Sequence, residues 1–331
     1  MTRTTVPAQN APINLIYIAG TGRAGSTLLE LLLNAHSSIA SCGELHVWPR
    51  ELTVGRGNRC GCGLPVVECP FWVELLARVD PLELPEPGIH HFRRGWHGGE
   101  YHARPVALIR NPSVEPPSSE ERIYAENNHL VMRSVADLWE ERSGVRPRWL
   151  VDASKDAYRL CWLLRSDRFR IKTIHLVRDP RGYVRSAERI GRRALSRVAR
   201  LRGVAVQAAV WNLRNHLVRE VLAHHASPTD HCTVTYEALA QDPEKTLRRV
   251  CATIGCEFES DMITRFRDAP VHAISGNAMR FEHTGIEFDE SWRKVLSRSE
   301  QALALGVSHL PSRLVLAALA ARERLGGGPV H

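Results

Sequence analysis

The chain has 331 residues, 44% of them hydrophobic and 24% charged, which excludes a fibrous or wholly disordered protein. Its formal net charge of +8 favours acidic partners such as nucleotides or sulfated substrates. The basic residues are spread along the chain without an aromatic-interleaved basic motif, so we expect no nucleic-acid partner. We find no apolar run of membrane-spanning or signal-peptide length, which predicts a cytoplasmic protein without membrane insertion.

Residues 14–33, NLIYIAGTGRAGSTLLELLL, predict an apolar strand, a glycine-punctuated turn and an apolar helix. In such a turn, backbone N–H groups and the positive end of the helix converge on one anion. A nucleoside-triphosphate loop has a lysine where this chain has Ser26, whereas here a cation stands three residues earlier, at Arg23. The pattern therefore predicts a phosphate loop that lacks the usual ATP-binding lysine.

The 5′-phosphosulfate loop of the sulfotransferases resembles the run Arg23-Ala24-Gly25-Ser26-Thr27, and this resemblance implies that these five residues bind the donor. The stretch 20–52 is similar to the tyrosylprotein sulfotransferases and their bacterial relatives, in which Glu44 would be the catalytic base. From the residues alone, a carboxylate or an imidazole within reach could take the proton of an attacking hydroxyl, so His46 is the alternative base. The resemblance favours Glu44.

Three cysteines lie close together in Cys60-Gly61-Cys62-Gly63 and Cys69-Pro70-Phe71-Trp72. In a cytoplasmic chain, reduced thiols or metal ligands are expected rather than disulfides. The three thiols could ligate zinc with a fourth group such as Cys42 or a histidine, or they could simply pack a glycine-rich loop. Bacterial sulfotransferase-like sequences carry a similar segment, so the cluster supports the resemblance, and we assign no metal from it.

The segment 80–117 is rich in Pro, Gly, His and Arg and has weak periodicity, which predicts an irregular path over one edge of the core. Apolar residues then recur at helical spacing over 119–142. We expect an irregular and helical insertion at about 53–147 that shapes the acceptor site.

An apolar strand over 149–152 is followed by Lys155 and Asp156 at the start of a helix. Open α/β sheets place ligand groups at the carboxyl ends of their strands. A lysine beside the positive end of a helix is unfavourable unless an anion binds there. In the tyrosylprotein sulfotransferases a similar Lys-Asp pair follows the corresponding strand, which implies that Lys155 helps to neutralise the bridging oxygens during sulfate transfer.

A third strand is predicted over 171–177 and ends at Arg178, with Ser186 eight residues further on. This Arg…Ser pair matches the sulfotransferase 3′-phosphate signature, in which a guanidinium fork and a hydroxyl both donate to the phosphate. Asp179 is the expected cap of the helix that follows, with Pro180 at its first position.

Long helices are predicted over 206–224 and over 237–255, the second closed by Gly255. A fourth strand ends at Tyr236, and the resemblance implies that this tyrosine lies near the nucleotide. The stretch 272–281 resembles a bacterial sulfotransferase loop that closes over the 3′-phosphate and adenine. In that loop Arg280 would supply a second phosphate cation.

Apolar strands alternating with helices, and a phosphate loop after the first strand, predict a parallel α/β sheet with helices on both faces. The resemblance implies a P-loop NTPase-like sulfotransferase fold in a single domain over 13–325, with a helix over 310–325. We expect the flanking segments 1–12 and 326–331 to be disordered.

The activity implied by the resemblance is sulfuryl transfer from 3′-phosphoadenylyl sulfate (PAPS) to a hydroxyl or amine acceptor. The acceptor would be a small molecule, a carbohydrate or a peptide. Arg23, Glu44 and Lys155 would be catalytic, with Glu44 as general base. A P-loop nucleotide-dependent kinase and a catalytically silent nucleotide-binding protein are the alternatives.

Overall fold

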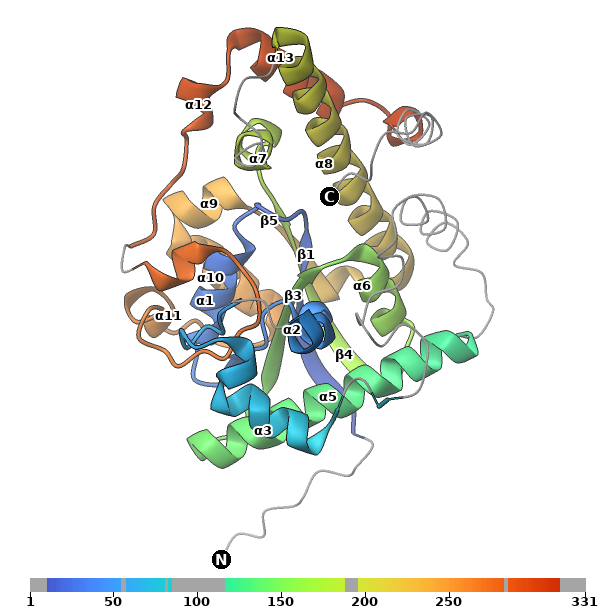
Figure 1. The fold of residues 1–331 in the computed structure, drawn as a ribbon, viewed down its shortest axis with the longest axis vertical. Helices are drawn as coiled ribbons and strands as arrows, with labels where there is room; N and C mark the ends of the chain where they lie inside the picture. The colour runs from blue at the N-terminus through green and yellow to red at the C-terminus, as the bar shows by residue number, and fades with distance from the viewer. Residues whose placement is uncertain are drawn as a thin grey trace, which may run out of the picture.

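The structure, a computed structural model, describes residues 11–54, 58–80, 83–84, 117–187, 196–282 and 285–315. These residues form a five-stranded parallel sheet in the order β2-β3-β1-β4-β5 (Figure 1). The strands are β1 (Ile13–Gly20), β2 (Ile39–Ser41), β3 (Trp149–Lys155), β4 (Phe169–Val177) and β5 (His231–Thr235). Helices pack on both faces, so the predicted parallel α/β sheet with helices on both faces is confirmed.

The central strand β1 is buried on both faces. Leu15, Tyr17 and Ala19 point into one core, Ile16 and Ile18 point into the other, and none of the five is exposed to solvent. Successive side chains of a strand point to opposite faces, so a strand covered on both sides has to be apolar throughout. This requirement explains the unbroken apolar run of β1 from Leu15 to Ala19.

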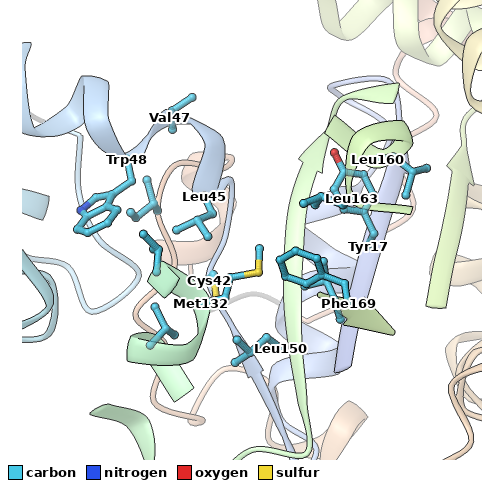
Figure 2. Close-up of a cluster of buried hydrophobic side chains, with 14 of the residues drawn as sticks. Tyr17, Cys42, Leu45, Val47, Trp48, Met132, Leu150, Leu160, Leu163 and Phe169 are labelled. Atoms are coloured by element: carbon cyan, nitrogen blue, oxygen red, sulfur yellow. The ribbon is translucent and has the colours of Figure 1, made fainter. Parts of the chain in front are cut away.

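The first face of the sheet is covered by helices α2 (Trp48–Val54), α3 (Pro70–Arg78), α5 (Ser119–Ser143), α6 (Ala157–Leu164) and α8 (Arg197–His225). Figure 2 shows part of this core, in which Tyr17 of β1 lies with Leu160 and Leu163 of α6. A reciprocal capping box between Ser118 and Glu121 starts helix α5. The helix stops before Gly144, whose positive φ of 77° is typical of a glycine that terminates a helix. This long helix confirms the prediction over 119–142.

The second face is covered by helices α1 (Ser26–Asn34), α9 (Tyr236–Gln241), α10 (Pro243–Ile254) and α11 (Asp261–Thr264). The single helix predicted over 237–255 is therefore wrong, because the chain breaks at Asp242. Pro243 has no N–H to continue the first helix, and the Asp242 side chain instead accepts from Lys245 N and caps the second. The predicted closure at Gly255 is confirmed by its φ of 81°.

Helices α7 (Pro180–Ala187), α12 (Trp292–Val295) and α13 (Arg298–Ser308) gather at the end of α8 (Figure 1). Helix α8 begins earlier than predicted, at Arg197, because the Ser196 hydroxyl accepts from Ala199 N. Short 3₁₀ helices occur at Leu45–Val47, Val66–Glu68, Pro228–Asp230 and Ala278–Phe281.

Several predictions fall on residues that the structure does not describe. They are the N-terminal segment 1–10, most of the irregular segment 80–117, and 316–331, which contains most of the helix predicted over 310–325. Among the described helices, none combines the length and the apolar composition that crossing a membrane requires.

The strand order reverses around β1. The connection after β1 leads to β2 at one edge of the sheet, whereas the chain after β4 leads to β5 at the other edge. Ligands of open α/β sheets bind outside the carboxyl ends of the strands at such a switch point. The topology thus predicts a ligand site at the carboxyl ends of β1, β3 and β4.

Candidate active site

A cavity of about 1050 Å³ lies at these strand ends. Side chains and backbone from distant parts of the chain form its wall. The predicted site residues that line it are Arg23, Gly25, Ser26, Thr27, Glu44, Lys155, Arg178, Ser186 and Tyr236. The structure therefore brings together residues that lie more than two hundred positions apart in the sequence.

The turn after β1 leads directly into α1 along the cavity wall. Gly25 is the N-cap, with φ 93°, and neither a side-chain cap nor an acidic residue occupies the first turn of α1. A Cβ at Gly25 would lie 2.6 Å from the Tyr236 ring, so only glycine fits. The backbone N–H groups at the start of α1 thus form an anion site. The remaining predicted loop residue, Ala24, instead packs its side chain into the second core.

Three non-glycine residues of the described chain have a positive φ, namely Arg23 (65°), Lys155 (63°) and Ser275 (61°). All three line the cavity. A non-glycine residue in the left-handed region costs on the order of 1–3 kcal/mol, and such residues cluster at functional sites. The shared location of these three strained residues makes this cavity the candidate functional site.

Glu44 and Lys155 form an ion pair, with Lys155 Nζ 2.7 Å from Glu44 Oε1. Lys155 Nζ also donates to the Ala153 carbonyl at 2.7 Å, which fixes the direction of the ammonium group. Glu44 follows the short strand β2, and its backbone N–H donates to the Ile274 carbonyl at 2.8 Å. The two charged groups that the sequence places 111 positions apart are thus in direct contact.

His46 lines the same cavity but is more buried than Glu44. The Glu44 side chain is 20% exposed, whereas His46 is 4% exposed. An acceptor substrate would therefore reach the carboxylate more readily than the imidazole.

A buried network lies behind Lys155, and reading the sequence missed it. Asp152 of β3 accepts from Arg159 Nε at 2.8 Å, and both side chains are fully buried. Asp152 also accepts from the backbone of Ser154, and Arg159 donates to Asn128 of α5 at 2.6 Å. Buried charges need such compensation, and together these bonds fix the end of β3 that carries Lys155. An aspartate inside an apolar strand was the available signal.

Arg178 follows β4, on the opposite side of β1 from Lys155, and is almost buried. Its Nη2 is 2.9 Å from Asp289 Oδ2, its Nη1 donates to the Arg23 carbonyl at 3.1 Å, and its guanidinium stacks 4.3 Å from the Tyr236 ring centroid. Ser186, on α7, lines the same cavity. The two residues predicted to bind the 3′-phosphate therefore line the same cavity, and the guanidinium is held against an aromatic ring.

Asp289 is a second feature that sequence reasoning missed. Burial favours its neutral form, but hydrogen bonds from Ser291 and Arg178 outweigh this and lower the pKa of Asp289 to about 2. Tyr236 holds the same segment, because its hydroxyl accepts from Asp289 N at 2.9 Å and donates to the Glu287 carbonyl at 3.1 Å. A carboxylate oxygen of the chain itself thus pairs with the Arg178 guanidinium.

Arg280 is not among the described residues that line the large cavity. Its guanidinium instead donates to the backbone carbonyls of Ser275 and Arg59. It lines a separate cavity of about 210 Å³. The 272–281 segment itself does reach the large cavity, through Ser275, Gly276 and Asn277.

Glu30 of α1 is a buried carboxyl group that interacts electrostatically with both Glu44 and Lys155. Burial is the main reason that its pKa rises to about 7, although a hydrogen bond from Ser41 Oγ at 2.7 Å and the charge of Lys155 oppose the rise. This group therefore titrates near neutral pH.

The model of a family described as "Sulfotransferase family" matches residues 102–260. A search of curated proteins found no match.

The chain is also similar to several solved structures. The sulfotransferase domain from the Synechococcus PCC 7002 olefin synthase has 22% identity, covering 96% of this chain and 97% of that one, with a TM-score of 0.44. The sulfotransferase domain from the curacin biosynthetic pathway has 19% identity, coverages of 97% and 100%, and a TM-score of 0.44. Sulfotransferase STF9 from Mycobacterium avium has 12% identity, coverages of 98% and 78%, and a TM-score of 0.43.

Proposed function

We propose that this chain, which belongs to a sulfotransferase family, transfers a sulfuryl group from PAPS to a hydroxyl or amine acceptor. The observation that carries the proposal is the contact between Glu44 and Lys155 on the wall of a cavity that also holds the phosphate loop and Arg178. A base, a cation for the leaving group and two anion sites are the parts that sulfuryl transfer requires.

The donor has two anionic ends, and the cavity offers two sites for them. Backbone N–H groups at the start of α1, together with Arg23 and Ser26, would hold the 5′-phosphosulfate. At the other end, Arg178 and Ser186 would hold the 3′-phosphate. There the phosphate would replace the Asp289 carboxylate on the guanidinium, because both are anionic oxygen ligands. ATP has no 3′-phosphate and would leave this second site unused.

In the reaction, the acceptor oxygen or nitrogen attacks sulfur while the bond from sulfur to the 5′-phosphate oxygen breaks. Glu44 takes the proton of the acceptor, and the electron pair of the broken bond stays on the 5′-phosphate. Lys155 and Arg23 stabilise the charge that develops there. Both cations already line the cavity, and Lys155 is held by Glu44 and the Ala153 carbonyl, which would reduce the reorganisation needed in the transition state.

Transfer from sulfur-labelled PAPS to pools of phenols, sugars, amines and peptides tests this function. We expect label to appear in at least one acceptor class and to depend on Glu44. If no acceptor pool is labelled while adenosine 3′,5′-bisphosphate still stabilises the protein, the chain is a silent nucleotide-binding protein. Stabilisation by ATP rather than by the bisphosphate would instead favour a kinase.

A further inference from the structure

The cysteine segment and the 272–281 segment meet at a group of four potential metal ligands. Cys60, Cys62, Cys69 and His272 each offer one ligand atom, and these atoms all lie within 4.8 Å of one another. We propose that these four residues bind a structural zinc ion. The sequence alone assigned no metal here and offered Cys42 as a possible fourth ligand, but the structure places Cys42 in the first core and His272 beside the thiols.

The distances between the ligand atoms fit tetrahedral zinc. With Zn–S bonds of about 2.3 Å and Zn–N bonds of about 2.0–2.1 Å, tetrahedral geometry separates two sulfurs by about 3.8 Å and a sulfur from a nitrogen by about 3.6 Å. In the structure, Cys62 Sγ and Cys69 Sγ are 3.6 Å apart. His272 Nδ1 lies 3.4 Å from Cys69 Sγ and 3.8 Å from Cys60 Sγ. These three separations between ligand atoms are thus close to those of a tetrahedral Cys₃His zinc site.

The imidazole of His272 is held in the orientation that ligation requires. Its ring stacks on Phe71 with a centroid separation of 4.7 Å and an interplanar angle of 7°. Trp139 of α5 packs edge-on against both rings, with centroid separations of 6.2 Å from His272 and 6.0 Å from Phe71. Because the ring is fixed while Nδ1 points at the thiols, little conformational entropy would be lost when metal binds.

The backbone around the cysteines forms a tight ligand-bearing turn. Cys60 N donates to the Leu64 carbonyl at 2.7 Å and Gly63 N donates to the Cys60 carbonyl at 2.9 Å, with Gly63 at φ 92°. Gly61 N also donates to the Ala273 carbonyl at 2.9 Å. A Cβ at Gly61 would lie 2.9 Å from the Val271 carbonyl oxygen, so this close approach needs glycine. The two ligand-bearing segments are therefore joined by backbone as well as by side chains.

The proposed zinc site would carry only a small net charge. Three thiolates and a neutral imidazole around Zn²⁺ carry a net charge of −1 once the thiols have released their protons. Arg280, which is bonded to the Arg59 carbonyl next to Cys60, places a cation beside this cluster. Arg280 would therefore support the metal site, in addition to the role that the sequence predicts for it.

Four protein ligands leave no open coordination position, so the ion would have a structural and not a catalytic role. The segment that it would anchor runs from His272 to Asn277. Within this segment, the Ile274 carbonyl accepts from Glu44 N at 2.8 Å, and Asn277 N donates to Thr27 Oγ1 at 3.0 Å. Zinc would thus brace one segment that touches both the proposed base and the phosphate loop.

Metal analysis of the purified full-length protein tests this proposal, whatever its enzymatic activity. After zinc loading and dialysis against a competing chelator, we expect about one zinc ion per chain. Cys62→Ser is the informative variant, because Cys62 is exposed and its loss should leave the fold intact. It should retain about tenfold less zinc under the same competition. Cys256→Ser, a partly exposed cysteine outside the cluster, is the matched control and should retain zinc like the wild type.

Two further measurements separate the alternatives. Cobalt in place of zinc should give a thiolate-to-metal charge-transfer band in the wild type and in Cys256→Ser but not with full intensity in Cys62→Ser. Titration of the unfolded, metal-free protein should find all eight cysteines as free thiols. The proposal is overturned if loaded wild type holds no zinc, if Cys62→Ser and Cys256→Ser hold equal amounts, or if two of the thiols are consumed in a disulfide.

Discussion

On either side of β1 the large cavity holds a cation against a carboxylate, but we propose opposite roles for the two carboxylates. Lys155 contacts Glu44 at 2.7 Å, and Arg178 contacts Asp289 at 2.9 Å. In the proposed reaction Glu44 and Lys155 both act, whereas Asp289 competes with the phosphate that Arg178 would bind. Removing Glu44 is therefore expected to lower the reaction rate, whereas removing the charge of Asp289 is expected to strengthen nucleotide binding. The predictions below use this contrast.

The largest effect is expected at the first pair. Glu44→Gln removes the proposed base, and loss of a general base typically lowers the rate by about 10²–10⁴-fold. We expect kcat to fall by this amount, while the affinity for adenosine 3′,5′-bisphosphate stays within about threefold because Glu44 does not contact the proposed 3′-phosphate site. Steady-state kinetics and calorimetric titration measure the two quantities.

His46→Gln is the matched control for Glu44→Gln, since both residues line the cavity. We expect it to keep most of the wild-type rate. If the His46 variant loses activity and the Glu44 variant retains it, the roles are reversed and the imidazole is the base.

The second effect concerns how the stability of the protein depends on pH through Glu30 of α1. The pKa of Glu30 is about 7 in the folded protein, against 4.5 as its ordinary value. Folding thus favours the protonated form, so this contribution to stability is present below about pH 4.5 and is lost as pH rises through about 7. The change corresponds to about 3 kcal/mol of unfolding free energy for Glu30 alone.

Urea unfolding at several pH values checks this prediction. The free energy of unfolding of the wild type should fall more between about pH 5 and pH 8 than that of Glu30→Gln, whose side chain does not titrate. Parallel pH profiles for the two proteins would show that Glu30 does not titrate in this window.

A smaller effect is expected at the second pair. Arg178→Lys keeps the positive charge but loses the guanidinium fork and its stacking on Tyr236. We expect adenosine 3′,5′-bisphosphate to bind about tenfold more weakly, which corresponds to one lost charge-assisted hydrogen bond. Calorimetry with adenosine 5′-monophosphate is the control, because a ligand without a 3′-phosphate should be affected much less.

Asp289→Asn should produce the smallest effect and one of opposite sign. It removes the charge that competes for Arg178, and because the Asp289 side chain is 44% exposed we expect only about threefold tighter binding of the bisphosphate. Glu290→Gln is the matched control, since Glu290 is 41% exposed and pairs instead with Arg293. Weaker binding by Asp289→Asn would show that this carboxylate positions the nucleotide and does not compete with it.

Local patterns predicted much of the fold. The apolar strand 15–19, the glycine turn after it and the helix over 119–142 depend on short-range chemistry, and all are present. The helix boundary at Asp242–Pro243 could also have been predicted, because proline has no backbone N–H to donate. The apolar stripe over 237–255 instead suggested one continuous helix.

The features that the sequence did not reveal depend on contacts between distant residues. Asp289 lies 111 positions from Arg178, and His272 lies 203 positions from Cys69. No periodicity connects such pairs, because their contact is produced only when loops at the carboxyl edge of the sheet are folded together. Arg280 shows the same limit, since the carbonyl groups that hold it come partly from Arg59.

The most direct test of the central claim compares two nucleotides that differ in one group. Adenosine 3′,5′-bisphosphate and adenosine 5′-monophosphate are titrated calorimetrically into the wild-type protein under identical salt. The account predicts that the bisphosphate binds at least about tenfold more tightly, because the 3′-phosphate gains charge-assisted hydrogen bonds from Arg178 and Ser186. Equal affinities would contradict the assignment of this cavity as a PAPS site.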